Sequence, residues 1–260
     1  MSKITIEPKG HVLLVGVNRP DKMNAFDPDM YMQLAEGLGK LHSTRDLRCG
    51  LLFAHGSNFT SGLDLARWVE IFSSGSFPAL PDGYCDPFGL DESRRVGKPL
   101  VMAVQGICYT IGLELMLAAD IRVAASDTRF GQIEVKRGIY PVGGATVRLH
   151  EEIGWGNAMR YLLTGDEISA EEAYRMGLVQ EVVPPNRQFD RALELAEIVA
   201  EQAPLGVQAS LLSSRLARTE GHTRAIDRLL PELQPIMKSE DVREGVQSFL
   251  ERRKAQFKGV

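Results

Sequence analysis

The chain has 260 residues, of which 44% are apolar and 25% charged, a composition typical of a folded globular protein. Its 30 basic and 34 acidic residues nearly balance, so the charge gives no reason to expect nucleic acid or an anionic membrane as a partner. The three cysteines, Cys49, Cys85 and Cys108, lie far apart and support neither a disulfide framework nor a zinc site. No signal peptide, transit sequence or membrane span is recognisable, and we expect a cytoplasmic protein.

Short apolar strands alternate with helices along the first two thirds of the chain, which predicts an α/β fold. Strands are expected over residues 3–7, 11–17, 50–54, 100–104, 121–125, 130–135 and 178–183, the sixth extending the same layer as the fifth. Helices are expected from Pro28 and over residues 63–72, 145–153, 157–163 and 170–176. Three or four more helices follow Phe189, broken at Pro204 and near Gly221.

A long loop over residues 73–90 is rich in glycine and proline, which exclude regular structure there. Loops of this length inside a compact domain are usually functional or mobile. Phe77, Tyr84 and Phe88 in this loop could cover an apolar ligand. The alternative interpretation is a variable surface insertion.

Residues 101–144 carry the clearest chemical signal. Glu114 lies on an apolar helix, between Leu113 and Leu115, where an ionised carboxylate needs a partner or a shifted pKa. A second carboxylate, Glu134, follows twenty positions later. Two such groups beside a glycine-bearing turn suggest proton transfer. The alternatives are a Glu114 satisfied by backbone groups or by an arginine such as Arg122, and a Glu134 paired with Lys136 or Arg137 at the surface.

Several common catalytic motifs are missing. The five histidines fall in no His-Glu-x-x-His or paired-ligand spacing, so we expect no metal site. No Gly-x-Ser-x-Gly elbow and no phosphate-binding Gly-x-x-x-x-Gly-Lys occurs. The nearest match to a dinucleotide fingerprint, GWGNAM from Gly154, has Met159 where the last glycine belongs. Serine hydrolases, dehydrogenases and kinases therefore lack their usual sequence features here.

The chain resembles the enoyl-CoA hydratase/isomerase superfamily, whose fold is called the crotonase fold. The resemblance rests on NRPDKMNAF, NFTSGLDL, QGICYTIGLELMLAADIRVA, FGQIEVKRGIYPVGGATVRL, LLTGDEISAEEAYRMGLVQEVVP and FLERRKAQFK, in this order and spacing. It implies a crotonase-like core of repeated strand-strand-helix units over residues 1–200. A C-terminal helical region over residues 201–260 is then expected to assemble a homotrimer or a dimer of trimers.

The resemblance also implies chemistry on a coenzyme A thioester. Coenzyme A would enter as part of the acyl-CoA substrate, and no tightly bound cofactor is expected. The backbone N–H groups of Leu63 and Ile111 would form the oxyanion hole. Glu114 would deprotonate the water that attacks C3, and Glu134 would exchange the proton at C2, which makes enoyl-CoA hydratase the expected activity. Isomerisation or another lyase or hydrolase reaction of the superfamily is the alternative.

Binding residues follow from the same matches. The residues expected to contact coenzyme A or substrate are Lys22, Met23, Ala25, Asp64, Leu65, Ala66, Tyr140 and Arg252, the last from a neighbouring subunit. Thr110-Ile111-Gly112 departs from the usual run of glycines, and we expect the Ile111 side chain to take up space beside the thioester. A non-catalytic crotonase-fold protein is a further hypothesis; the net charge of −4 argues against the RNA-binding form of it.

Overall fold

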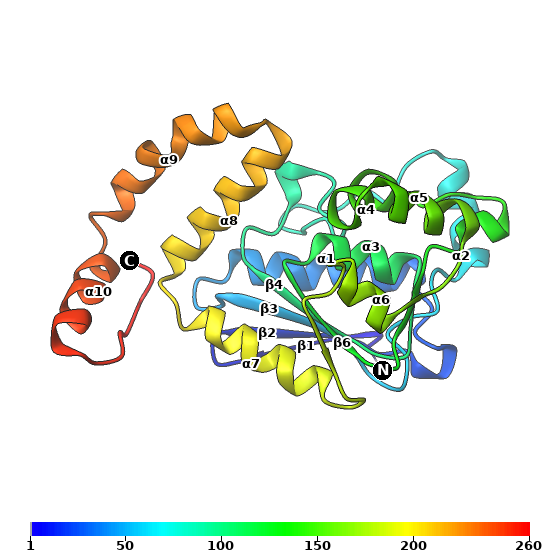
Figure 1. Cartoon of the computed structure of the whole chain (residues 1–260), viewed down its shortest axis with the longest axis horizontal. Helices are drawn as coiled ribbons and strands as arrows, with labels where there is room; N and C mark the ends of the chain where they lie inside the picture. Colours follow the sequence, from blue (N-terminus) through cyan, green and yellow to red (C-terminus); the bar gives the residue numbers. More distant parts are fainter. Residues whose placement is uncertain (1) are drawn as a thin grey trace.

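Two sheets, the helices that cover them and a helical arm make up the protein, whose computed structural model describes residues 2–260 (Figure 1). The main sheet has the order β1-β2-β3-β4-β6-β9, and only the β1/β2 pair is antiparallel. Its strands are β1 (Ile4–Lys9), β2 (Val12–Val17), β3 (Cys49–Ala54), β4 (Leu100–Val104), β6 (Ile121–Ala125) and β9 (Glu181–Val183). A smaller sheet contains β5 (Ile107–Tyr109), β7 (Arg129–Gly131) and β8 (Ile168–Ser169). The expected α/β class is confirmed.

Helices cover both faces of the main sheet, and others form the arm. In chain order the helices are α1 (Pro28–Ser43), α2 (Leu65–Ser73), α3 (Ile111–Ala118), α4 (Ala145–Ile153), α5 (Trp155–Thr164), α6 (Ala170–Arg175), α7 (Gln188–Ala200), α8 (Pro204–Thr219), α9 (His222–Ile236) and α10 (Glu240–Glu251). Three short 3-10 turns are η1 (Pro20–Lys22), η2 (Glu92–Arg94) and η3 (Glu134–Arg137). Figure 1 shows α7 on one face, packed against β3, β4 and β6, and α1 and α3 on the other.

Alternating strand residues supply the two cores, because successive side chains of a strand point to opposite faces. Leu51 and Val101 pack with α7, whereas their neighbours Leu52 and Met102 belong to the larger cluster on the α1 and α3 side. In α1 one apolar face points inward, since Leu34 and Leu38 are at most 1% exposed. The core thus holds α3, and with it Glu114, against the sheet.

The strand expected over residues 130–135 is corrected by the structure. β7 does not extend the layer of β6; it pairs with β5 and β8 in the smaller sheet. The reason lies at Gly106, whose φ of +55° turns the chain out of the main sheet after β4 and starts β5. Glu134 then lies in η3 and not in a strand.

The arm formed by α8, α9 and α10 extends away from the sheets (Figure 1). The expected breaks are confirmed, because α8 begins at Pro204 and α9 begins directly after Gly221. The division of the chain expected at residue 200 falls between α7 and α8 and stays a prediction. Among residues 2–260, no helix combines the length and the apolar character needed to cross a membrane.

Candidate active site

Glu114 lies in the first turn of α3, a helix whose residues are all buried. Its carboxyl group is 4% exposed, and its Oε1 accepts a hydrogen bond of 3.3 Å from the backbone N–H of Ala145, the first residue of α4. The alternative expectation, that backbone groups satisfy the Glu114 carboxylate, is therefore confirmed in part. The arginine alternative is wrong, because Arg122 pairs with Glu152 at 3.1 Å and donates to the Leu178 carbonyl.

Gly143 lets the chain approach this carboxylate closely. A Cβ atom at this position would lie 2.5 Å from Oε2 of Glu114 and 2.7 Å from the ring of Phe88. Any side chain here would displace one of these two groups. The first glycine of the sequence PVGG, Gly143, is therefore required because the site leaves no room for a side chain at this position.

Glu134 is also buried, at 6% exposed, and the expected alternative of a surface ion pair is wrong. Lys136 instead lies 3.8 Å from Asp166. The amide of Gln132, itself 1% exposed, faces the Glu134 carboxylate; with its nitrogen turned inward it donates to both oxygens, at 2.8 and 2.9 Å. The sequence interpretation missed Gln132, whose signal is a polar residue two positions before the glutamate.

Burial sets the pKa of both glutamates. It raises the pKa of Glu114 to about 7, against the lowering effect of hydrogen bonds from the Ala145 and Gly143 N–H groups and of the Arg148 charge. Burial first, and the charge of Glu114 second, raise the pKa of Glu134 to about 8. The two carboxylates therefore sense each other and hold a proton between them close to neutral pH.

The segment before Leu63 runs beside the segment before Ile111. Thr60 pairs with Cys108, and a Cβ atom on Gly62 would lie 2.5 Å from Oγ1 of Thr110. The backbone N–H groups of Leu63 and Ile111 follow this contact directly, and neither donates to another residue in the described part of the chain. The structure thus brings the two expected donors together at the N-terminus of α3, one turn before Glu114.

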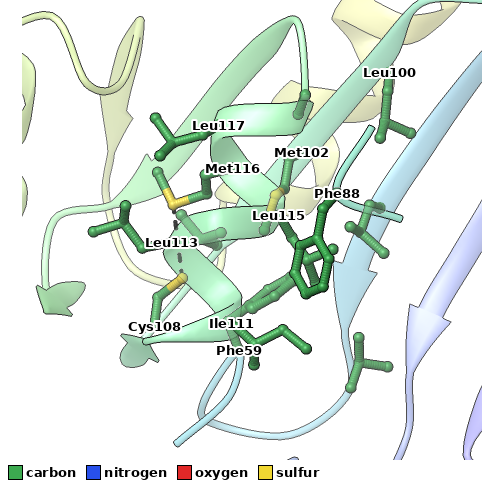
Figure 2. Close-up of a cluster of buried hydrophobic side chains, with 14 of the residues drawn as sticks. Phe59, Phe88, Leu100, Met102, Cys108, Ile111, Leu113, Leu115, Met116 and Leu117 are labelled. Atoms are coloured by element: carbon green, nitrogen blue, oxygen red, sulfur yellow. Dashed lines mark hydrogen bonds between the residues drawn. The ribbon is translucent and has the colours of Figure 1, made fainter. Parts of the chain in front are cut away.

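Thr110 precedes Ile111 and faces Gly62, and its backbone has an unfavourable conformation. Its φ of 48° and ψ of −113° are rare for a β-branched residue, and its buried Oγ1 has no hydrogen-bond partner among residues 2–260. The expectation that the Ile111 side chain occupies space beside the thioester stays a prediction. That side chain is 1% exposed and lies in the apolar cluster with Phe59 and Phe88 (Figure 2).

The residues expected to contact coenzyme A form a neighbouring surface. Ser61 N–H donates to the Met23 carbonyl at 2.9 Å, which places the loop of Lys22, Met23 and Ala25 beside the segment that ends at Leu63. Lys22 and Met23 are exposed and Ala25 is half-buried, as are Leu63 and Asp64, while Leu65 and Ala66 are exposed at the start of α2. Asp64 uses its carboxylate to bind Arg19 at 3.0 Å.

Tyr140 and Arg252 lie farther from this surface along the fold. Tyr140 is 64% exposed in the loop after η3. Arg252 ends α10 with a φ of 56°, on the arm that Figure 1 shows well away from α3 within one chain. The structure therefore does not bring Arg252 to the site of its own chain. Its expected role from a neighbouring subunit stays a prediction.

Among residues 2–260, no group of three or more histidine, cysteine, aspartate or glutamate side chains lies close enough to hold a metal ion. The site consists of two buried carboxylates, a pair of free backbone donors and an open surface beside them. This arrangement defines an acid–base site for a substrate in which an oxygen atom gains negative charge.

Comparison with known proteins agrees with this class. The family model described as enoyl-CoA hydratase/isomerase matches residues 7–260, and the chain belongs to this family. Enoyl-CoA hydratase EchA19 of Mycobacterium tuberculosis is 36% identical over 257 residues, covering 97% of this chain and 95% of that protein. (E)-benzylidenesuccinyl-CoA hydratase of Thauera aromatica is 34% identical over 260 residues, covering 99% of each.

Solved structures confirm the crotonase-type fold. A probable enoyl-CoA hydratase/isomerase from Mycobacterium abscessus is 46% identical and superposes with a TM-score of 0.96, covering 100% of this chain and 99% of that one. An enoyl-CoA hydratase from Mycobacterium tuberculosis is 32% identical with a TM-score of 0.88, covering 99% of each chain. The protein is thus an enzyme of the hydratase/isomerase superfamily.

Proposed function

We propose that the protein is an enoyl-CoA hydratase, which adds water across the 2,3 double bond of a 2-enoyl-CoA thioester. The observation that carries this proposal is the pair of buried glutamates, Glu114 and Glu134, whose pKa values are raised by burial to about 7 and about 8. Hydration requires both functions at once: a base to deprotonate water and an acid to protonate carbon. An isomerase can move one proton with a single carboxyl group.

The order of events follows from the positions of the groups. The thioester oxygen binds at the N–H groups of Leu63 and Ile111, where each donor contributes about 3 kcal/mol of transition-state stabilisation in comparable sites. The positive end of the α3 dipole adds to this field. Glu114 removes a proton from a water molecule while the oxygen of that water attacks C3. The thioester oxygen then gains negative charge, and Glu134 delivers a proton to C2.

The half of the substrate that does not react binds at the neighbouring surface. The coenzyme A moiety lies along the loop of Lys22, Met23 and Ala25 and the stretch from Asp64 to Ala66, with Tyr140 near the acyl end. The loop and the stretch from Asp64 support the proposal by their placement, since they border Leu63, one of the two oxyanion donors. Several relatives named as hydratases, at 30–36% identity, point to the same reaction.

Purified protein with crotonyl-CoA and longer 2-enoyl-CoAs tests the proposal. We expect the absorbance of the conjugated thioester to fall, the product to gain the mass of one water molecule, and no free thiol to appear. Free thiol would indicate a hydrolase. A folded protein that turns over no chain length would contradict the hydratase assignment.

A second candidate is an acyl-CoA isomerase, favoured by the relative named 1,2-epoxyphenylacetyl-CoA isomerase, which is 31% identical over 251 residues. This reaction would move protons or oxygen within the acyl group without adding water. It predicts a product of unchanged mass. It also predicts that activity depends mainly on one of the two glutamates.

We also propose that the arm assembles the protein into trimers, or pairs of trimers. A groove of about 570 Å³ between α8 and α9 is lined by apolar side chains, including Leu212, Leu229 and Leu233. Leu230 is 76% exposed and Phe249 on α10 is 81% exposed. Such an extended apolar surface is stable in water when a second copy covers it. In this assembly Arg252 of one chain would approach the coenzyme A phosphates of the next.

A further inference from the structure

Phe88, from the long loop, lies beside Glu114 and Gly143 in the reaction site. Its ring lies 2.7 Å from the position of a Cβ atom on Gly143, the same position that lies 2.5 Å from Oε2 of Glu114. Figure 2 shows Phe88 along the same side of α3 as Ile111 and Leu115. A thioester held at the N-terminus of α3, with its C3 atom at Glu114, would therefore direct the rest of its acyl group toward Phe88.

The backbone around Phe88 is fixed by two charged side chains. Asp86 accepts hydrogen bonds from the N–H groups of Phe88 at 2.9 Å, Leu90 at 2.7 Å and Asp91 at 3.0 Å. Arg148 on α4 donates to the carbonyls of Phe88 and Gly89. Asp86 thus binds the backbone N–H groups of this turn, and Arg148 binds its carbonyl groups. Phe88 itself is 2% exposed, so the ring has one well-defined position.

Phe88 also lines a pocket that the reaction site does not use. This pocket has a volume of about 510 Å³, and its lining combines apolar residues, among them Tyr31, Phe77, Leu80 and Phe88, with the charged Asp86, Asp91 and Arg94. The Phe88 ring packs against Phe77 and Tyr31, with centroids 5.3 and 5.8 Å apart. Phe88 therefore borders both the contact of Gly143 with Glu114 and the pocket, and we call its ring the wall between them.

We propose that Phe88 is the specificity-determining residue that ends the acyl path. This inference rests on the proposed function and names its substrate class: a 2-enoyl-CoA with a short acyl chain. A longer chain would have to displace a buried aromatic ring held by Asp86 and Arg148. Removing the ring would join the site to the pocket of Tyr31 and Phe77, which then receives the far end of a long acyl group.

The test compares crotonyl-CoA and 2-decenoyl-CoA as substrates of the wild type, Phe88→Ala and the milder Phe88→Leu. We expect the wild type to prefer crotonyl-CoA, and the variants to raise the ratio of kcat/KM for decenoyl over crotonyl substrate by about tenfold or more. Phe77→Ala is the matched control: it enlarges the same pocket but leaves the wall, so the ratio should stay within about twofold of the wild type. Phe88→Leu decides if Phe88→Ala does not fold.

The proposal is overturned if the folded Phe88 variants keep the wild-type ratio, or if the wild type uses decenoyl-CoA as well as crotonyl-CoA. Failure of the proposed function gives a different result, namely no turnover of any substrate by the wild type. In that case, binding of the saturated butyryl-CoA and decanoyl-CoA to the same proteins decides. If only the Phe88 variants bind decanoyl-CoA more tightly, the proposed role of Phe88 is supported. If the ratio of decanoyl-CoA to butyryl-CoA affinity is the same in all proteins, the proposal is overturned.

Discussion

Glu114 and Glu134 are buried at a free-energy cost that their surroundings offset only in part. Glu114 accepts backbone N–H groups and Glu134 faces the amide of Gln132, but neither forms an ion pair within residues 2–260. Ionising both would place two like charges in one buried space. The pair therefore holds a proton near neutral pH, which is the state that acid–base addition of water needs.

This shared proton predicts a bell-shaped pH profile. At pH values below about 7 both carboxyl groups are protonated and no base is present; above about 8 both are ionised and no acid is present. We expect kcat/KM for crotonyl-CoA to be highest between these values and to fall on each side. A profile that stays flat from about pH 5.5 to about pH 9.5 would show that the pair does not control the rate.

Burial of Glu114 also predicts a pH-dependent stability difference. Its pKa rises from 4.5 to about 7 on folding, so ionisation favours the unfolded state. As pH rises from 4.5 to about 7, the folded wild type loses up to about 3 kcal/mol, and the loss is complete above that pH. Glu114→Gln lacks this loss. The Tm of Glu114→Gln relative to that of the wild type should therefore increase between about pH 5 and about pH 7.5.

An exposed glutamate supplies the control for this measurement. Glu7 is exposed at the edge of the main sheet, and Glu7→Gln should follow the wild type in Tm across the same pH range. If the Tm of Glu114→Gln differs from that of the wild type by the same amount at every pH, burial does not raise the pKa of Glu114 in the folded protein.

Gly143 gives a steric prediction at the same scale. Gly143→Ala places a methyl group 2.5 Å from Glu114 Oε2 and 2.7 Å from Phe88, so the carboxylate must move. Misplacement of a reacting group by about 1 Å can cost about a hundredfold in rate, and we expect kcat to fall by about that factor. Gly156→Ala in α5 is the matched control, since its Cβ meets nothing within 4 Å. Equal kcat values for the two variants would contradict the assigned position of Glu114.

At the scale of elements, long segments were predictable and short ones were not. The apolar face of α1 and the proline and glycine that start α8 and precede α9 are local signals, and the structure confirms them. β5 and β8 have only three and two residues, too few for a period to show. β7 was placed in the wrong sheet because its partners are chosen by the turn at Gly106 and not by its own sequence.

The attachment of the arm yields a prediction for this scale. Arg215 on α8 is 10% exposed in its side chain, pairs with Asp120 at 3.1 Å and donates to the Val96 carbonyl. Replacing one partner of a buried pair leaves the other charge unpaired, and we expect Arg215→Met to lower the free energy of unfolding by about 3 kcal/mol. The pair Arg175–Glu172 on α6, outside the arm, is exposed. Arg175→Met should therefore leave the free energy of unfolding close to that of the wild type in the same denaturant titration.

Equal losses for the two arginine variants would contradict this view of the arm. They would mean that the ion pairs between α8 and the core contribute no more than a surface pair. A concentration-independent loss of the expected size in Arg215→Met would show that the contact lies within one chain.

At the scale of the whole molecule, the site was predictable where it follows sequence order. Ile111, Glu114 and Glu134 lie in one stretch of the chain, whereas Leu63 was expected beside them only from the family resemblance. Gln132 was missed although it stands two positions before Glu134. The turn held by Asp86 and Arg148 could not be predicted, because nothing in the sequence says which distant side chains converge on it. The complete burial of the Ile111 side chain could not be predicted either, because the core around Phe59 decides it.

The exposed arm predicts an assembly. We expect light scattering after size exclusion to give a mass of three or six chains for the wild type. Leu230→Glu places a charge in the apolar surface of α9, where Leu230 is 76% exposed, and should lower the mass to that of fewer chains. Leu163→Glu on α5, where Leu163 is 73% exposed, is the control and should leave trimers intact. A monomeric wild type would contradict the assembly proposal.

The central claim is that two glutamates act together on one enoyl-CoA. Turnover of crotonyl-CoA by the wild type, Glu114→Gln and Glu134→Gln, each checked for folding by circular dichroism, tests it most directly. Since positioned acid–base groups contribute about a hundredfold to ten-thousandfold, each single change should lower kcat by at least about a hundredfold. A folded variant of either glutamate that retains wild-type kcat would contradict the claim.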